Sequence, residues 1–178
     1  MRKSRTMKRT SEYGFTLIEL IIVLSIASIL LSMAVPNYSA FVQDSLLTAQ
    51  SNNFASTLAL AKSEAIKRSS RVSICPSTNG TGCTGGSVWS NGWVVFANPN
   101  GDSTIDAGEE ILQVGSALSG GNTLAGTKTR ITFTSNGFVM GFFDSFSLCD
   151  RRGIAYSKKI ILNSQGRTRF ETGNGACS

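Results

Sequence analysis

The segment Gly14–Leu20 reads GFTLIEL, and it places an acidic residue near the start of a long apolar run. Between Phe15 and Val35, Glu19 is the only charged residue. As an α-helix these 21 residues reach about 32 Å, enough to cross a hydrocarbon core of about 30 Å. A carboxylate in such a segment costs roughly 2.5–3.5 kcal/mol on insertion scales. Glu19 therefore needs a role that offsets this cost.

The net charge of the 178-residue chain, +6, is concentrated before the apolar run. The first 14 residues hold five basic residues and one acidic residue, whereas the remainder holds 12 basic and 10 acidic residues. A basic tail before an apolar span is typical of a cytoplasmic anchor, with the following chain on the other side of the membrane. The tail does not indicate nucleic-acid binding.

Three interpretations of the apolar run treat Glu19 differently. The run can be a plain single-span anchor, or a secretory signal peptide cleaved near Ser32-Met33-Ala34; neither gives the carboxylate a role. The third interpretation, cleavage between Gly14 and Phe15, gives Glu19 a role. Phe15 then carries a free α-amino group one helical turn from Glu19. In an assembly, Glu19 can neutralise this terminus on a neighbouring subunit. Gly14 suits such a cleavage, since a residue without Cβ leaves the backbone accessible to a protease.

A basic leader followed by GFTLIEL and an apolar run resembles the prepilin cleavage motif of type IV pilins and type II secretion pseudopilins. The resemblance implies cleavage after Gly14 by a prepilin peptidase, N-methylation of Phe15, and Glu19 as the assembly glutamate. It also implies a single-pass protein of the bacterial inner membrane, with a periplasmic C-terminal domain. Its partners are then other pilins or pseudopilins, and after assembly it belongs to a surface filament.

Helical sequence is predicted to continue beyond the apolar run. Pro36 is expected to kink the helix, and residues 37–69 are rich in Ala, Leu, Lys and Glu. The apolar positions of this segment follow a helical period: Leu47, Phe54, Leu58, Ala61 and Ala65. This stripe is expected to be the surface on which a globular domain packs.

Two further stretches narrow the family. ALAKSEAIKRSSRVSICPS (residues 59–77) and WSNGWVVF (residues 89–96) resemble the GspH/FimT branch of the pilin-like proteins. That branch contains the type II secretion H pseudopilin and minor pilins of type IV pili. The resemblance covers the first half of the chain well and the second half loosely.

From Arg71 onward the sequence is typical of short β-strands. The candidate strands are RVSIC, VWSNGWVVF, EEILQVG, TRITFTSNGFVM, FSLC and KKIILNSQGRTRF, separated by Gly, Asn and Ser. Asn136-Gly137 is a hairpin turn signal. We therefore expect an α+β, pilin-like fold, in which a long N-terminal helix packs on an antiparallel β-sheet domain. The expected segments are a leader (1–14), a transmembrane and assembly helix (15–35), an amphipathic helix (36–69) and a β-rich domain (70–178).

The four cysteines are expected in an oxidising compartment, where disulfides form. Three pairings are possible. We favour Cys75 with Cys83, which bracket one loop, and Cys149 with Cys177, which would hold the C-terminal end in place. A zinc site is disfavoured, because the chain has no histidine and lacks the short Cys-x₂₋₄-Cys spacing.

Enzyme activity is not expected. Without histidine, the chain lacks the commonest general base and most nucleophilic triads. No cofactor is expected either, with calcium as the one alternative. In ANPNGDSTIDAGEEIL, oxygen-bearing side chains fall at positions 1, 3, 5, 7, 9 and 12 of a calcium loop: Asn98, Asn100, Asp102, Thr104, Asp106 and Glu109. Asn98 replaces the usual first Asp and Ser103 the usual Gly, so a solvated acidic loop is the competing interpretation.

Charge is divided unevenly within the β-rich domain. Residues 72–127 contain four acidic residues and no basic residue, whereas residues 128–178 contain eight basic and three acidic residues. Such opposed charges can match neighbouring subunits in a filament. Alternatively, the basic half can bind an anionic partner outside the cell.

The segment QGRTRF, Gln165–Phe170, resembles the C-terminal Gly-Arg-x-Arg motif of DNA-binding FimT-type minor pilins. On a strand, Arg167 and Arg169 point to one face, about 6.8 Å apart. DNA contacts are therefore a hypothesis for six basic residues: Arg167, Arg169, Lys158, Lys159, Arg151 and Arg152. Such contacts would be made to phosphates, so binding should be non-specific and salt-dependent. A hairpin with two ordinary surface arginines is the alternative.

These observations favour a minor pilin of a type IV pilus that primes or caps assembly and binds extracellular DNA for uptake. The alternative is a type II secretion pseudopilin with a purely structural role. The region of Trp89 and Trp93 is expected to serve subunit contacts.

Overall fold

The computed structural model describes residues 14–102, 104–141 and 144–177. The chain divides into two compact units, Met1–Ala40 and Phe41–Ser178. One helix, α1 (Leu17–Lys67), begins in the first unit and ends in the second. Apart from Gly14, the expected basic leader lies outside the described residues.

The described part of the first unit consists largely of the apolar portion of α1. Its serine hydroxyls donate to carbonyls one turn earlier, as Ser25 Oγ does to Ile22 O at 2.8 Å, so they bring few unsatisfied polar groups into an apolar environment. α1 continues through Pro36, beside which Asn37 Nδ2 donates to Met33 O at 2.9 Å. The kink expected at Pro36 stays a prediction.

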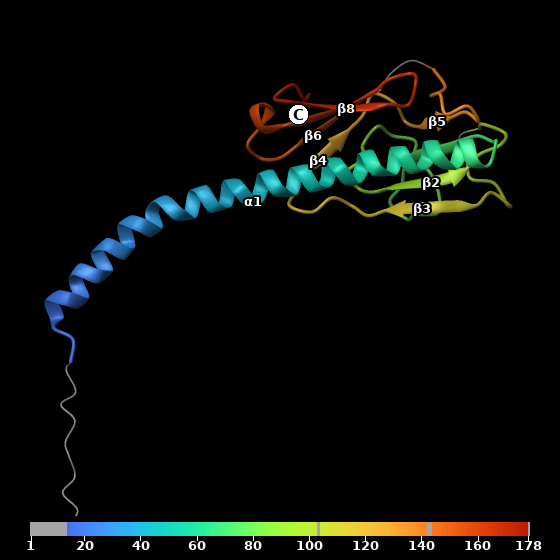
Figure 1. The fold of residues 1–178 in the computed structure, drawn as a ribbon. Helices are drawn as coiled ribbons and strands as arrows, with labels where there is room; N and C mark the ends of the chain where they lie inside the picture. Colours follow the sequence, from blue (N-terminus) through green and yellow to red (C-terminus); the bar gives the residue numbers. More distant parts are fainter. Residues whose placement is uncertain (1–13, 103, 142–143, 178) are drawn as a thin grey trace, which may run out of the picture. The chain divides into compact units, whose positions relative to one another are not determined.

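The second unit contains the remainder of α1 and two four-stranded antiparallel sheets (Figure 1). Sheet A has the strand order β3-β2-β1-β5, and sheet B has the order β4-β6-β7-β8. The strands are β1 (Val72–Pro76), β2 (Trp93–Ala97), β3 (Ile111–Gly115), β4 (Thr123–Ala125), β5 (Ile131–Phe133), β6 (Asp144–Cys149), β7 (Lys158–Leu162) and β8 (Thr168–Thr172). A short 3₁₀ helix, η1 (Ile154–Tyr156), precedes β7.

The expected α+β fold is confirmed, with a second sheet that the sequence pattern did not separate from the first. Each predicted strand segment overlaps at least one observed strand, whereas β4 was not predicted. Asn136-Gly137 does form a turn: Gly137 has φ 77°, and Thr134 N donates to Phe138 O at 2.8 Å. Beyond this turn, Phe133 and Val139 form an antiparallel bridge.

The core lies where α1 meets the two sheets. All five residues of the predicted apolar stripe, from Leu47 to Ala65, are buried. Phe54 is in edge-to-face contact with Trp89, Trp93 and Phe146, at ring-centroid distances of 5.6, 5.0 and 4.7 Å. Both tryptophan side chains are 0% exposed and hold α1 against the sheets. The expectation that the region of Trp89 and Trp93 serves subunit contacts stays a prediction.

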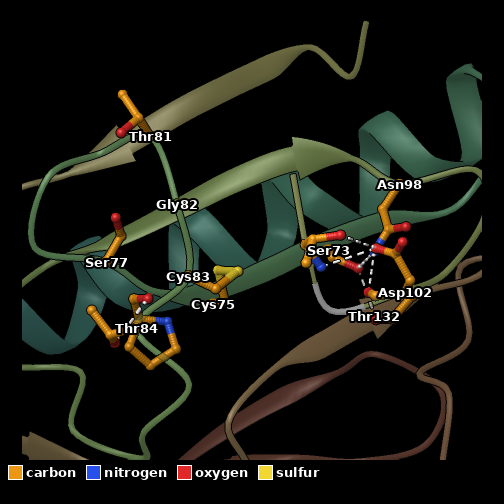
Figure 2. The surroundings of a disulfide bond; sticks show 12 residues. Ser73, Cys75, Ser77, Thr81, Gly82, Cys83, Thr84, Asn98, Asp102 and Thr132 are labelled. Carbon is orange, nitrogen blue, oxygen red and sulfur yellow. Dashed lines mark hydrogen bonds between the residues drawn. A yellow bond between two sulfur atoms is a disulfide. The ribbon is translucent and has the colours of Figure 1, made fainter. Parts of the chain in front are cut away.

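The second unit contains two disulfides, and their cysteines are paired as the sequence analysis favoured. Cys75 is bonded to Cys83, and Cys149 is bonded to Cys177. The first closes the loop that follows β1 and is drawn in Figure 2. The second joins the end of β6 to the C-terminal tail, where Ala176 N also donates to Ser147 Oγ at 2.9 Å.

Candidate functional site

The apolar portion of α1 carries the first candidate site. By length and composition, α1 is the one helix in the described residues that could cross a membrane, and none of its most apolar 18-residue window is buried within the chain. Phe15 is 82% exposed. An unburied apolar surface of this size requires lipid or another helix as its environment.

Glu19 lies in the first turn of α1, and its surroundings show a local role that the sequence reasoning missed. Glu19 N donates to Thr16 Oγ1 at 3.3 Å, so Thr16 caps the helix N-terminus. Thr16-Leu17-Ile18-Glu19 has the Thr-x-x-Glu spacing of a capping box. A carboxylate in the first turn also interacts favourably with the helix dipole.

The second candidate site is a groove on sheet B of about 760 Å³. Its lining includes three of the six predicted basic residues, Lys159, Arg167 and Arg169, together with Glu171. Arg169 Nη2 lies 3.0 Å from Glu171 Oε1, and the Arg169 side chain is 70% exposed. Among the described residues, the side chains of Lys159 and Arg167 have no hydrogen-bond or ionic partner. The groove therefore presents two unpaired cations and one paired cation.

The turn between β7 and β8 holds Arg167 in place. Asn163 Oδ1 accepts a hydrogen bond from Arg167 N at 2.8 Å, and Asn163 N donates to Arg167 O at 3.0 Å. Val139 N donates to Ser164 O at 2.9 Å, which ties the turn to the β5 hairpin. Lys62 of α1 completes the support, because its Nζ donates to Gln165 O at 2.8 Å. The groove end is thus preorganised by three separate segments.

The remaining three predicted basic residues do not line this groove. Lys158 and Lys159 are adjacent on β7 and point to opposite faces, and Lys158 Nζ lies 3.5 Å from Thr172 Oγ1. Arg151 lines a different hollow of about 580 Å³, beside Cys149 and Ile154. Three of the six basic residues predicted to bind DNA therefore line the groove, and three lie elsewhere.

Arg152, the last of the six, is engaged within the domain. Its Nη2 lies 2.7 Å from Asp44 Oδ1 on α1 and 2.7 Å from Asp150 Oδ2. Its guanidinium carbon also lies 4.2 Å from the centroid of the Tyr156 ring. The hydrogen bonds to Asp150 and then Asp44 raise the pKa of Arg152. A guanidinium bound in this way is a structural cation rather than a free one for a ligand.

The acidic loop after β2 is held together by its own polar groups. Asn100 Nδ2 donates to Asp102 Oδ2 at 2.9 Å and to Asp106 Oδ2 at 2.8 Å, and Thr104 Oγ1 lies 3.1 and 3.2 Å from their Oδ1 atoms. Asp106 N donates to Glu109 Oε2 at 3.0 Å. The hydrogen bond from the Thr104 backbone amide is the main cause that lowers the pKa of Asp102. Five of the six predicted calcium ligands thus lie along one chain of contacts.

Asn98, the predicted first calcium ligand, has a different role. It is fully buried, and its Nδ2 donates to Ser73 Oγ at 2.9 Å and to the Asp102 carbonyl at 3.0 Å (Figure 2). Its Oδ1 accepts from Gly101 N at 2.7 Å, and Ser73 Oγ is also bonded to Thr132 Oγ1 at 2.8 Å. Asn98 therefore anchors the loop to β1 and β5.

The fit of the loop to a cation is incomplete. Within the described ranges, no group of three or more His, Cys, Asp or Glu side chains is arranged to hold a metal ion. Ser103, the predicted turn position, lies outside the described residues. On the other side of the loop, Arg71 and Arg130 donate to the carbonyls of residues 99–101. Calcium binding stays a prediction.

Comparison with known proteins agrees with the fold and the N-terminal motif. Residues 9–35 match the prokaryotic N-terminal methylation motif. The chain is 27% identical over 172 residues to the pilin-like protein PilA1 of Thermus thermophilus, covering 89% of this chain and 97% of that protein.

Two solved structures share the fold. The type IV minor pilin FimU of Pseudomonas aeruginosa superposes with a TM-score of 0.59 at 17% identity, over 78% of this chain and 98% of FimU. The minor pseudopilin EpsH of the Vibrio cholerae type II secretion system superposes with a TM-score of 0.51 at 9% identity, over 74% of this chain and 99% of EpsH. The family described as type II transport protein GspH matches residues 50–166. Because that match covers well over half of the chain, this chain belongs to the GspH family of minor pilins and pseudopilins.

Proposed function

We propose that this chain is a minor pilin of a type IV pilus, cleaved after Gly14 by a prepilin peptidase and incorporated to prime or cap the filament. The single observation that carries the proposal is the wholly unburied apolar part of α1, whose one charged residue is Glu19 in the first turn. Before assembly, the apolar part lies in the inner membrane, with the second unit in the periplasm. In the filament, neighbouring helices replace the lipid.

The role of Glu19 follows from electrostatics. Cleavage creates an α-amino group at Phe15, and methylation leaves it positively charged. Because opposite charges attract more strongly in an apolar environment than in water, Glu19 of one subunit stabilises the terminus of another. An unpaired carboxylate would oppose entry into the filament.

The test uses Glu19→Ala in the full chain. The variant should insert and be cleaved, because the peptidase acts at Gly14, but its incorporation into sheared filaments should fall. Mass spectrometry of the wild type should show a mature N-terminus at methylated Phe15. A mature chain that begins at Val35 would contradict the proposal and indicate a signal peptide.

A structural role in type II secretion is the alternative within the same family. The two assignments differ in phenotype, because loss of a secretion pseudopilin blocks export of secreted enzymes and leaves pili in place. Deletion of this chain, scored for both pili and secreted enzymes, separates them. We expect loss of pili with normal secretion.

DNA binding is a second candidate function, favoured by the unpaired cations of the sheet B groove. The side chains of Lys159, Arg167 and Arg169 lie where a phosphate backbone can reach all three. Because no base-reading geometry is implied, binding is expected to be non-specific, and each neutralised phosphate adds roughly 0.9 to the slope of log affinity against log salt. Extracellular DNA taken up by the cell is the proposed ligand.

A gel-shift experiment with residues 37–178 tests this second function. Arg167→Gln with Arg169→Gln should abolish the shift at low salt. The matched control is Arg151→Gln with Lys158→Gln, which removes the same charge outside the groove and should retain most binding. Equal losses in the two double variants would indicate a general charge effect and contradict a specific groove.

A further inference from the structure

The segment 151–156, which we call the η1 turn, combines exposed apolar side chains with an exposed cation. Ile154 and Tyr156 are 53% and 48% exposed, and Arg151 is also exposed. Tyr is enriched at membrane–water interfaces, where its ring lies at the level of the lipid headgroups. Arginine near such an interface buries its stem and keeps its charge in the polar layer. The composition of the η1 turn is therefore typical of a membrane surface contact.

The η1 turn is held firmly against the portion of α1 that enters the second unit. Arg152 Nη2 lies 2.7 Å from both Asp44 Oδ1 and Asp150 Oδ2, and its guanidinium stacks on the Tyr156 ring. One side chain thus connects a helix residue, the residue after β6 and the tyrosine. The position of the η1 turn within this unit is fixed near Asp44.

Chain length keeps Asp44 close to any membrane that holds the apolar run. Asp44 is nine residues beyond Val35, where that run ends. Nine residues span about 14 Å as a helix and about 31 Å when fully extended. The extended length is an upper limit for any path of the chain from Val35 to Asp44. The η1 turn is therefore tethered within reach of the headgroup layer.

Arg151 is the exposed cation of the η1 turn. Arg152 is shared by Asp150, only 5% exposed, and Asp44, so the four ionised groups sum to zero, but no ion pair engages Arg151 itself within the described residues. Arg151 is then available to anionic lipid phosphates, which attract exposed basic residues near the bilayer.

We propose that the η1 turn contacts the headgroup region of the membrane in which the chain is anchored. Ile154 lies among the uppermost acyl carbons, the Tyr156 ring lies at the level of the headgroups, and Arg151 lies at anionic phosphates. The contact presupposes the membrane anchor formed by the apolar part of α1, which begins at Leu17. It orients the folded domain on the membrane before assembly and is broken when the subunit leaves the bilayer for the filament.

The experiment uses the full chain in vesicles of phosphatidylethanolamine and phosphatidylglycerol, with a fluorescent NBD label on Ile154→Cys. The four native cysteines are oxidised in pairs and do not take the label. Val114→Cys is the matched control, because Val114 on β3 is 54% exposed, close to the 53% of Ile154. Lipids with a nitroxide near the top of the acyl chain should quench the label at 154 and shift its emission to the blue. The label at 114 should show neither effect.

A second variant tests the charge contribution. Arg151→Gln, in the chain labelled at 154, should shift the contact equilibrium toward the free state by about fivefold in vesicles containing phosphatidylglycerol. It should have little effect in neutral vesicles. An equal effect in both kinds of vesicle would overturn the assignment of Arg151 to lipid phosphate.

Three outcomes would overturn the contact itself. Equal quenching at 154 and 114 would show that the η1 turn has no preferred place at the bilayer. Protection of the 154 label that rises with protein density would assign the surface to a neighbouring subunit instead. Carbonate extraction tests the anchor separately from the contact. A chain that resists extraction, but whose 154 label stays in water, has the anchor and lacks the contact. A chain that is extracted lacks both.

Discussion

Lys62 of α1 donates a hydrogen bond from Nζ to the carbonyl of Gln165, at 2.8 Å, across 103 residues of sequence. Gln165 belongs to the turn that presents Arg167, so the helix directly supports the end of the basic groove. The same Nζ lies 3.5 Å from the carbonyl of Gly166. The geometry of the groove therefore depends on a residue that does not line it.

Replacing Lys62 with methionine should weaken this support. The variant keeps an apolar stem of similar length and removes the donor, which should lower the free energy of unfolding of residues 37–178 by about 1 kcal/mol. DNA affinity should also fall, because the turn holds Arg167 less firmly. The control is Lys67→Met, since the Lys67 side chain is 75% exposed and, within the described residues, pairs with Glu64. In urea unfolding and in the gel shift, the stability and the DNA affinity of this control should stay close to those of the wild type.

Gly166→Ala should destabilise the domain by more than the strain of its left-handed backbone conformation alone. Gly166 has φ +70°, and a Cβ there would lie 2.8 Å from the carbonyl oxygen of Gly137. Gly121 has nearly the same φ, +71°, and a Cβ at that position would meet nothing within 4 Å. Gly121→Ala should therefore report only the left-handed backbone strain, roughly 1–2 kcal/mol. If thermal unfolding shows the same loss for both variants, the contact with Gly137 is not limiting.

Local patterns in the sequence predicted the elements well. The stripe from Leu47 to Ala65 is read from helical period alone, because residues one turn apart share a face whatever the tertiary structure. The disulfide pairs followed from loop position and the compartment. β4 was missed because three residues, TLA, carry too little pattern, and this strand exists through its pairing with β6.

Long-range placement could not be predicted in the same way. Lys158 and Lys159 belong to opposite faces of sheet B. Which of the two shares a face with Arg169 depends on the register of β7 and β8. Arg152 is paired with Asp44, 108 residues away, which no local pattern indicates. The complete burial of Trp89 was not predicted, because aromatic residues are typical of both cores and interfaces.

The capping role and the assembly role of Glu19 can be separated. Glu19→Gln keeps a residue that suits the third position of a capping box but loses the charge. Thr16→Ala retains the charge and removes the cap, at a cost of about 1 kcal/mol of helix stability. If neutralisation of the Phe15 terminus drives assembly, Glu19→Gln should be absent from sheared filaments and Thr16→Ala should be reduced only modestly. The reverse order would assign Glu19 to helix capping.

The C-terminal tail should lose its ordered backbone when its disulfide is removed. Gly175 N donates to Ser157 Oγ at 2.8 Å and Ala176 N to Ser147 Oγ at 2.9 Å, and both contacts lie near Cys177. Replacing Cys149 and Cys177 with serine should raise hydrogen exchange at these two amides and destabilise the domain by roughly 2–4 kcal/mol. Unchanged exchange would mean that the hydrogen bonds alone hold the tail.

The acidic loop makes a separate prediction about calcium. Asp102 and Asp106 share the contacts of Asn100, whereas Asn98 is buried and committed to Ser73 and Gly101. With the first ligand position engaged elsewhere, any affinity should be weak, in the roughly millimolar range of extracellular calcium modules. The lowered pKa of Asp102 keeps this carboxylate ionised at lower pH than an ordinary aspartate, so protons should compete less with a cation there.

Calorimetric titration of residues 37–178 with calcium decides the question. Asp102→Asn with Asp106→Asn should remove the heat of binding, because both carboxylates face the same polar cluster. Glu110→Gln is the control, since Glu110 is bonded to Arg68 at 2.6 Å and lies one residue beyond the proposed ligands. A bound ion would also raise the melting temperature of the wild type and of this control, because a ligand that binds only the folded state stabilises it by mass action. Absence of heat at millimolar calcium would end the hypothesis and leave the segment as an acidic loop held by Asn100 and Thr104.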